Sequence, residues 1–91
     1  MEDVAYLLRG RVRRKTLISI KNEPKTATEI SKDVNKHRSS ISRVLANLVD
    51  DGYARCDNPK DDKYRFYSIT GDGLKLLEKT EKYLRKTDGK I

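Results

Sequence analysis

The sequence has little that would hold a fold together covalently or through a metal. It contains a single cysteine, Cys56, so no intramolecular disulfide can form and nothing indicates an oxidising compartment. One cysteine and one histidine are too few for a thiolate-rich metal site. We therefore expect no metal or other cofactor, and interpret Cys56 as a small core residue rather than a redox switch.

Long apolar runs are also missing. No stretch approaches the ~18 apolar residues that a membrane span needs, and the N-terminus lacks the apolar segment of a signal peptide. With 91 residues, no internal repeat and no low-complexity linker, residues 1–91 are expected to form a single domain. The sequence thus predicts a soluble cytoplasmic protein with no membrane partner.

Catalytic groups are scarce, whereas positive charge is abundant. No nucleophile–base pair and no paired carboxylates indicate an active site, so an enzyme is not expected. The 21 lysines and arginines outnumber 14 aspartates and glutamates, which gives a formal charge of +7 and a pI near 9.6. This balance favours a polyanionic partner, although a charged surface also serves solubility.

The first apolar segment, residues 4–20, has helical spacing on two faces. One face carries Val12, Thr16, Leu17 and Ile20, and the other carries Val4, Leu7, Leu8 and Ile18. Either the helix breaks near Gly10, or one helix buries two faces against two different surfaces.

Two further helices follow, with only a short turn between them. Thr26 and Glu29 have the spacing of a capping box, which predicts a helix over residues 27–34. After a turn at Asn35 and Lys36, a helix over about residues 37–51 is expected to end at a glycine. Its apolar residues predict one buried stripe: Ile41, Val44, Leu45, Leu48 and Val49.

Beyond Gly52 the apolar period changes from about 3.6 to about 2 residues. The runs "YARC" and "YRFYSI" enclose "DNPKDDK", whose Asn, Asp and Pro favour a turn, so residues 53–69 are predicted to form a β-hairpin. Thr70 then caps a last helix from Gly71 to about Lys86, and residues 87–91 are expected to fray.

This order of elements is that of a winged helix-turn-helix, an α+β fold that is mainly α, with a three-helix core, a β-hairpin wing and a C-terminal helix. The residues also resemble a family. "EISKDVNKHRSSISRVLANLVDDGY" is similar to the helix-turn-helix of MarR/ArsR-type transcription regulators of a compact archaeal or bacterial type. "YSITGDG" resembles the junction after their wing, and with "RRKTLISI" the resemblance covers about residues 9–80.

The resemblance implies a sequence-specific regulator that binds double-stranded DNA, with helix 37–51 in the major groove and hairpin 53–69 as the wing. The chemistry of the helix start agrees, because free N–H groups and a positive dipole end suit phosphate, and arginine can donate two hydrogen bonds to guanine. The candidate DNA contacts are Lys36, His37, Arg38, Ser39, Ser40, Ser42 and Arg43, with Lys63 and Arg65 on the wing and Arg14 at phosphate.

Several of these residues have a plainer interpretation. The three serines can cap the helix, and Arg38 and Arg43 can be merely solvated. His37 can be a neighbour of the N-cap. The run from Arg9 to Lys15 is more often a solvated face than a backbone contact. The hairpin tip carries aspartates beside its lysines, so the wing is expected to touch phosphate only along its base.

A homodimer is expected, because the first and last helices have more apolar circumference than one small core covers. Segments at about 3–9 and 71–86 are predicted to make the contact, with Val4, Leu7, Leu8, Leu76 and Tyr83 as candidates. Two other functions stay open: a winged-helix protein–protein adaptor, and a non-specific chromatin-like DNA-coating protein. The operator, the sign of regulation and any small-molecule effector are unknown from the sequence.

Overall fold

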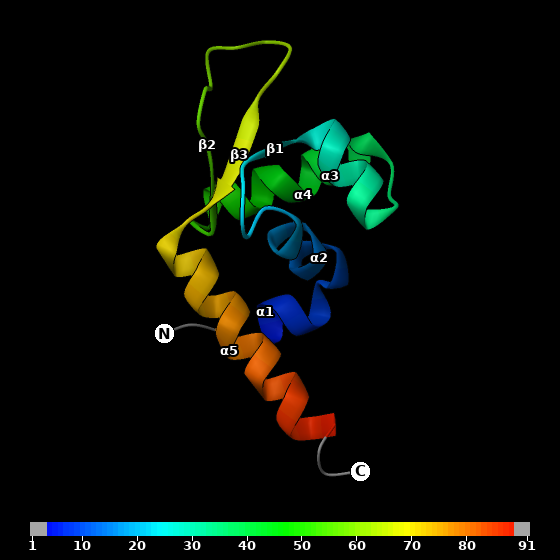
Figure 1. Cartoon of the computed structure of the whole chain (residues 1–91), viewed down its shortest axis with the longest axis vertical. Helices are drawn as coiled ribbons and strands as arrows, with labels where there is room; N and C mark the ends of the chain where they lie inside the picture. Colours follow the sequence, from blue (N-terminus) through cyan, green and yellow to red (C-terminus); the bar gives the residue numbers. More distant parts are fainter. Residues whose placement is uncertain (1–3, 89–91) are drawn as a thin grey trace.

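The computed structural model describes residues 4–88, which form helices around a small core and an antiparallel sheet that extends into a hairpin (Figure 1). The mainly helical winged helix-turn-helix predicted from the sequence is confirmed. The elements are α1 (Val4–Arg9), α2 (Arg11–Ser19), β1 (Lys25–Thr26), α3 (Ala27–Val34), α4 (Arg38–Asp50), β2 (Ala54–Cys56), β3 (Phe66–Ile69) and α5 (Gly71–Asp88).

The first helical segment breaks at Gly10, which separates α1 from α2. The Gly10 N–H still bonds to the Tyr6 carbonyl at 3.3 Å, and its own carbonyl accepts from the Arg14 N–H at 3.0 Å. The break lets α1 turn its Leu7 and α2 turn its Leu17 into the same core, where both side chains are fully buried. The first of the two alternatives for this segment is therefore correct.

Helix α3 begins with the predicted capping box. The Glu29 N–H donates to the Thr26 hydroxyl at 3.2 Å, and the Glu29 carboxylate accepts from the Thr26 N–H at 3.0 Å. Asn35 ends the helix in the left-handed conformation, with φ of 59°. These two ends hold α3 to eight residues and set the short turn that leads into α4.

The sheet has the strand order β1-β3-β2, with both pairings antiparallel. The hairpin of β2 and β3 was predicted, but β1 was not, because a strand of two residues has no periodicity to detect. Thr26 pairs with Phe66, so the residue that caps α3 also joins the wing. The base of the wing is thereby fastened to the start of α3.

The core lies where the five helices meet. Its fully or nearly fully buried apolar side chains are Leu7, Leu17, Ile20, Ile30, Val34, Ile41, Leu45, Leu48, Ala54, Leu76 and Leu77. Two sequence predictions need correction here. Val49 is 36% exposed, since at roughly 100° per residue it lies at the edge of the α4 stripe. Cys56 is half-buried outside the core, because it lies at the opposite end of β2 from Ala54, the residue through which that strand joins the core.

Thr70 joins the end of α4 to the start of α5. Its hydroxyl donates to the Gly52 carbonyl at 2.7 Å and accepts from the Gly73 N–H at 3.0 Å, as the predicted cap requires. Gly52 has φ of +83°, the left-handed stop expected after α4. At Gly73 a Cβ would lie 2.0 Å from the Tyr53 carbonyl oxygen, so the close approach of α5 to the residue before β2 needs glycine.

Helix α5 runs to Asp88, further than predicted, because no glycine or proline interrupts residues 74–88. Residues 89–91 of the expected frayed tail lie outside the described part. Figure 1 shows the last turns of α5 continuing past α1, away from the wing. None of the helices described is long and apolar enough to cross a membrane.

Candidate nucleic-acid interface

Helix α4 presents a polar face directly opposite the core. Ile41 and Leu48 are fully buried, whereas Ser39 and Arg43, which lie about half a turn away, are exposed. Neither Arg38 nor Arg43 forms an ion pair with any described residue. The polar face therefore carries cationic groups that nothing within the described chain neutralises.

The start of α4 lacks a side-chain cap. His37 is the N-cap residue, and its imidazole makes no capping hydrogen bond. The hydroxyls of Ser39, Ser40 and Ser42 form no hydrogen bond within residues 4–88, and all three serines are exposed. The interpretation of these serines as caps is therefore not supported, and N–H groups of the first turn remain open to an outside acceptor.

The acidic residues of the wing are largely engaged by the wing itself. Asp57 accepts from Arg55 Nε at 3.1 Å and from the Ser68 hydroxyl at 2.5 Å. The Asp61 carboxylate accepts from the Tyr64 and Lys63 N–H groups at 2.9 and 2.8 Å, and these hydrogen bonds hold its pKa below the usual value. Two of the aspartates that made the wing look weakly basic thus serve to shape its turn.

The amide of Asn58 completes this turn. It donates to the Tyr64 carbonyl at 2.6 Å and accepts from the Phe66 N–H at 2.7 Å, bridging the two sides of the hairpin beyond the last ladder pair. The Arg65 guanidinium donates to the Asp61 carbonyl at 2.9 Å. The backbone of the tip is consequently held by hydrogen bonds within the hairpin, which fixes the positions from which its side chains project.

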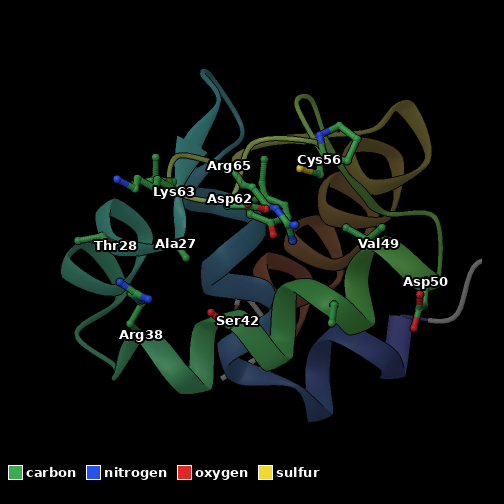
Figure 2. Close-up of a pocket in the computed structure, with 14 residues that line it drawn as sticks. Ala27, Thr28, Arg38, Ser42, Val49, Asp50, Cys56, Asp62, Lys63 and Arg65 are labelled. Atoms are coloured by element: carbon green, nitrogen blue, oxygen red, sulfur yellow. The ribbon is translucent and has the colours of Figure 1, made fainter.

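A hollow of about 630 Å³ lies between α4 and the wing; we call it the helix-side hollow. Figure 2 shows Arg38 and Ser42 along α4 on one side, and Lys63, Asp62 and Arg65 of the wing on the other. Thr28 at the start of α3 also lines it. Cations and hydroxyls from three separate elements thus surround one hollow, which suits an anionic chain.

A second hollow of about 710 Å³ adjoins the first; we call it the aromatic hollow. It shares Thr26, Thr28, Arg38, Asp62 and Lys63 with the helix-side hollow and adds Glu29, Tyr64 and Phe66. Tyr64 is 66% exposed and Phe66 39% exposed, which is unusual for large aromatic side chains. Neither residue was among the predicted DNA contacts, although their two-residue spacing in a strand-forming run indicates a shared face.

The arginines of α2 have a different role from the exposed arginines of α4. Arg13 lies over the Tyr6 ring at 4.4 Å and donates to the Tyr6 carbonyl at 2.9 Å, so it is a packing residue rather than a solvated cation. Arg14, a predicted phosphate contact, is half-buried on α2 and lines neither hollow. Its contact with phosphate stays a prediction.

The described residues contain no group of three His, Cys, Asp or Glu side chains that could hold a metal ion. Cys56 lines the helix-side hollow as a half-buried free thiol. The chemistry that the surface offers is therefore that of charge, hydrogen bonding and apolar contact.

These observations define a class: a winged helix-turn-helix whose second helix of the motif, α4, carries an exposed cationic face beside a preformed wing. Residues 15–70 match the family described as "Sugar-specific transcriptional regulator TrmB", which is more than half of the chain. The chain belongs to this family of transcriptional regulators. A search of curated proteins found no match.

Solved regulators share the fold. The chain is similar to RV1404 from Mycobacterium tuberculosis (TM-score 0.80, 15% identity, 97% of this chain and 63% of that one). It is similar to E. coli MarR in its apo form (TM-score 0.72, 24% identity, 86% and 62%). Lactococcus lactis ZitR in complex with DNA gives a TM-score of 0.66 at 14% identity, over 88% and 60%. The chain spans less than two thirds of the length of each of these proteins. The predicted MarR likeness is confirmed, and the ArsR likeness stays a prediction.

Only three of the five predicted dimer residues are accessible to a partner. Leu7 and Leu76 are 0% exposed in the single chain. Because their side chains are buried in its core, they are removed from the candidate interface. Val4 and Leu8 are half-buried, and Tyr83 is 52% exposed. A partner could therefore contact only these last three.

Proposed function

We propose that the chain binds double-stranded DNA in a sequence-specific way, with α4 in the major groove and the wing on the adjoining backbone. The observation that carries the proposal is the polar face of α4: Arg38 and Arg43 exposed and unpaired within residues 4–88, beside serine hydroxyls that cap nothing. Exposed arginine on a groove-sized helix is the group best suited to guanine.

The residues divide into two roles. Arg43 and Ser39 lie at the centre of the exposed face and are assigned to base edges. Lys36, His37 and Ser40 flank the helix start, and Arg38, Ser42 and Lys63 border the helix-side hollow; we assign them to the sugar–phosphate strand. Arg65 is tied to the Asp61 carbonyl and has fewer donors left for phosphate.

The helix-side hollow supports this arrangement. A backbone strand that borders the major groove passes between a helix in that groove and a wing beside it. The hollow between α4 and the wing has cations on both sides, and Thr28 adds a hydroxyl from the start of α3. Asp50 and Asp62 also line it and oppose a phosphate, which limits how tightly DNA of any sequence is held.

We also propose a homodimer, built from α1 and the protruding end of α5 around Val4, Leu8 and Tyr83. The support is the exposure of Tyr83 and the extension of α5 beyond its own core. Twofold symmetry would place two copies of α4 in major grooves about 34 Å apart, so the preferred site is an inverted repeat. Because a regulator of this kind acts on DNA, we propose that the protein is located in the cytoplasm.

Two other functions fit less of the surface. A protein–protein adaptor of the same fold has no use for unpaired arginines and serines at the start of α4. A DNA-coating protein uses the same cations but does not need Arg43 at the centre of the face. No observation favours catalysis, and we propose binding alone.

Selection of genomic fragments with the purified chain tests the proposal. Enrichment of an inverted repeat is the expected result. Indifferent recovery of all fragments indicates a coating protein, and no recovery indicates the adaptor. The affinity for the enriched fragment should fall steeply with salt, by about 0.9 in log K per log unit of salt for each phosphate neutralised.

A further inference from the structure

The exposed aromatic pair on the wing is the feature that the proposed function leaves unexplained. Tyr64 and Phe66 are among the largest exposed apolar side chains of the described chain, at 66% and 39% exposure. Both border the aromatic hollow. An apolar surface of this kind on a small charged protein indicates a contact partner.

The pair is held in place before any partner arrives. The Tyr64 N–H bonds to the Asp61 carboxylate at 2.9 Å, and the Tyr64 carbonyl accepts from Asn58 at 2.6 Å. The Phe66 N–H bonds to Asn58 at 2.7 Å, and Phe66 pairs with Thr26 of β1. The backbone of both residues is thus fixed, so binding would cost little ordering of the wing.

The surroundings of the pair are cationic and hydroxyl-bearing. Lys63 and Arg38 line the same hollow and form no ion pair within residues 4–88, and Thr28 adds a hydroxyl. Two carboxylates line it as well: that of Glu29 is engaged by the Thr26 N–H, whereas that of Asp62 opposes a phosphate. The hollow therefore places two unpaired cations beside an apolar wall, which suits an anionic chain that has apolar faces between its charges.

We propose that Tyr64 and Phe66 pack against deoxyribose rings of the DNA strand that borders the groove holding α4, while Lys63 and Arg38 hold its phosphates. The inference rests on the proposed function and adds to it an apolar component of binding on the wing. Sugar rings alternate with phosphates along the strand, so aromatic and cationic side chains in one hollow meet both. Sugar contact carries no sequence information, and the pair adds affinity rather than specificity.

The apolar origin of this contact sets it apart from the lysine contacts. Apolar burial releases no counterions, so it changes the intercept of log K against log salt and leaves the slope unchanged. Loss of a phosphate contact changes the slope. The salt titration thus separates the two kinds of contact in one measurement.

The test uses the full chain and a short synthetic duplex of arbitrary sequence. Tyr64→Ala and Phe66→Ala should each weaken binding about 5- to 20-fold at every salt concentration, with the slope unchanged. Lys63→Ala should lower the slope by about 0.9. Ile18→Ala, which removes another exposed apolar side chain on α2 outside both hollows, should leave binding unchanged.

A second readout comes from the absence of tryptophan in this sequence. Tyr64→Trp keeps a large ring at the position and introduces the chain's single tryptophan, which can be excited without exciting the remaining tyrosines. Its affinity should stay within about 3-fold of the parent chain. Its emission should change when the duplex is added, and melting curves confirm that each variant is folded.

The outcomes separate the inference from the function beneath it. If the parent chain binds no duplex, the proposed function fails. If it binds and Tyr64→Ala and Phe66→Ala bind equally well, only the inference is overturned. A changed salt slope in the alanine variants, or an unresponsive tryptophan at position 64 in a chain that binds, overturns it as well.

Discussion

The Tyr6 hydroxyl donates a hydrogen bond of 2.5 Å to the Asp51 carboxylate and so joins α1 to the end of α4. The Tyr6 ring also packs on Tyr53, with 5.2 Å between ring centroids, and lies beneath the Arg13 guanidinium. Burial and the hydrogen bond to Asp51 raise the pKa of Tyr6 above its ordinary value of 10.0. Helix α1, part of the proposed dimer interface, is therefore joined directly to α4, the helix proposed to enter the major groove.

Tyr6→Phe should lower the free energy of unfolding by about 1 kcal/mol at neutral pH, because it removes the bond to Asp51. The folded chain holds the phenol proton more tightly than the unfolded chain does. This stabilisation is complete below about pH 10 and is lost as the pH rises above it. Urea denaturation of both proteins should show a difference that is constant from pH 7 to about pH 10 and shrinks by about pH 11. A difference that stays constant throughout would show that the phenol proton plays no part.

Arg43→Ala and Arg14→Ala should differ in what they change. Arg43 lies at the centre of the exposed α4 face, so its loss should cost about 1–3 kcal/mol per half-site and reduce discrimination between the selected fragment and random DNA. Arg14 lies outside both hollows and is predicted to contact one phosphate, so its loss should weaken all duplexes about equally. Titrations on both duplexes check this. Uniform loss with Arg43→Ala would mean that another residue reads the bases.

Thr16→Val should stabilise the fold. The Thr16 hydroxyl is buried and has no hydrogen-bond partner among the described residues. Valine has almost the same shape and leaves nothing unsatisfied, so the gain should be about 1 kcal/mol. Thr80 is the matched control, because its buried hydroxyl donates to the Leu76 carbonyl at 2.8 Å. Thr80→Val should give no gain, and thermal melting of the two variants should rank them in that order.

Gly73→Ala should destabilise the fold by more than about 2 kcal/mol, because its Cβ would collide with the Tyr53 carbonyl and force α5 away from the strand. Gly71 begins the same helix and has open space around it. Gly71→Ala should change the free energy of unfolding by less than about 1 kcal/mol. Equal effects in denaturant unfolding would mean that helix propensity, rather than the close approach, governs both positions.

Tyr83→Glu together with Leu8→Glu should dissociate the proposed dimer, since charge would then face apolar surface across the twofold axis. Sedimentation at micromolar concentration should show dimers for the parent chain and monomers of 10.5 kDa for the variant. The circular dichroism spectrum should stay helical. A parent chain that sediments only as a monomer would remove the α1–α5 surface from the proposal.

The sequence by itself determined the order of the helices from α3 onward and of the hairpin, together with the orientation of α4. Local signals placed the start of α3, through the capping box at Thr26, and the end of α4, through the left-handed Gly52. The apolar stripe of α4 then identified the exposed face that holds Arg43, because side chains half a turn from a buried stripe must point to solvent. These features depend on neighbouring residues, which is why they could be read in order along the chain.

Tertiary structure decided whatever depends on residues distant in sequence. The first and last helices share one core, so Leu7 and Leu76 are buried in the single chain and cannot serve a partner. The wing gained a third strand, β1, which precedes α3 in the chain. The Asp61 carboxylate is engaged by two backbone N–H groups of the wing. Periodicity predicts which face of a helix or strand a side chain lies on. Only the packing between elements decides which other residues contact that face.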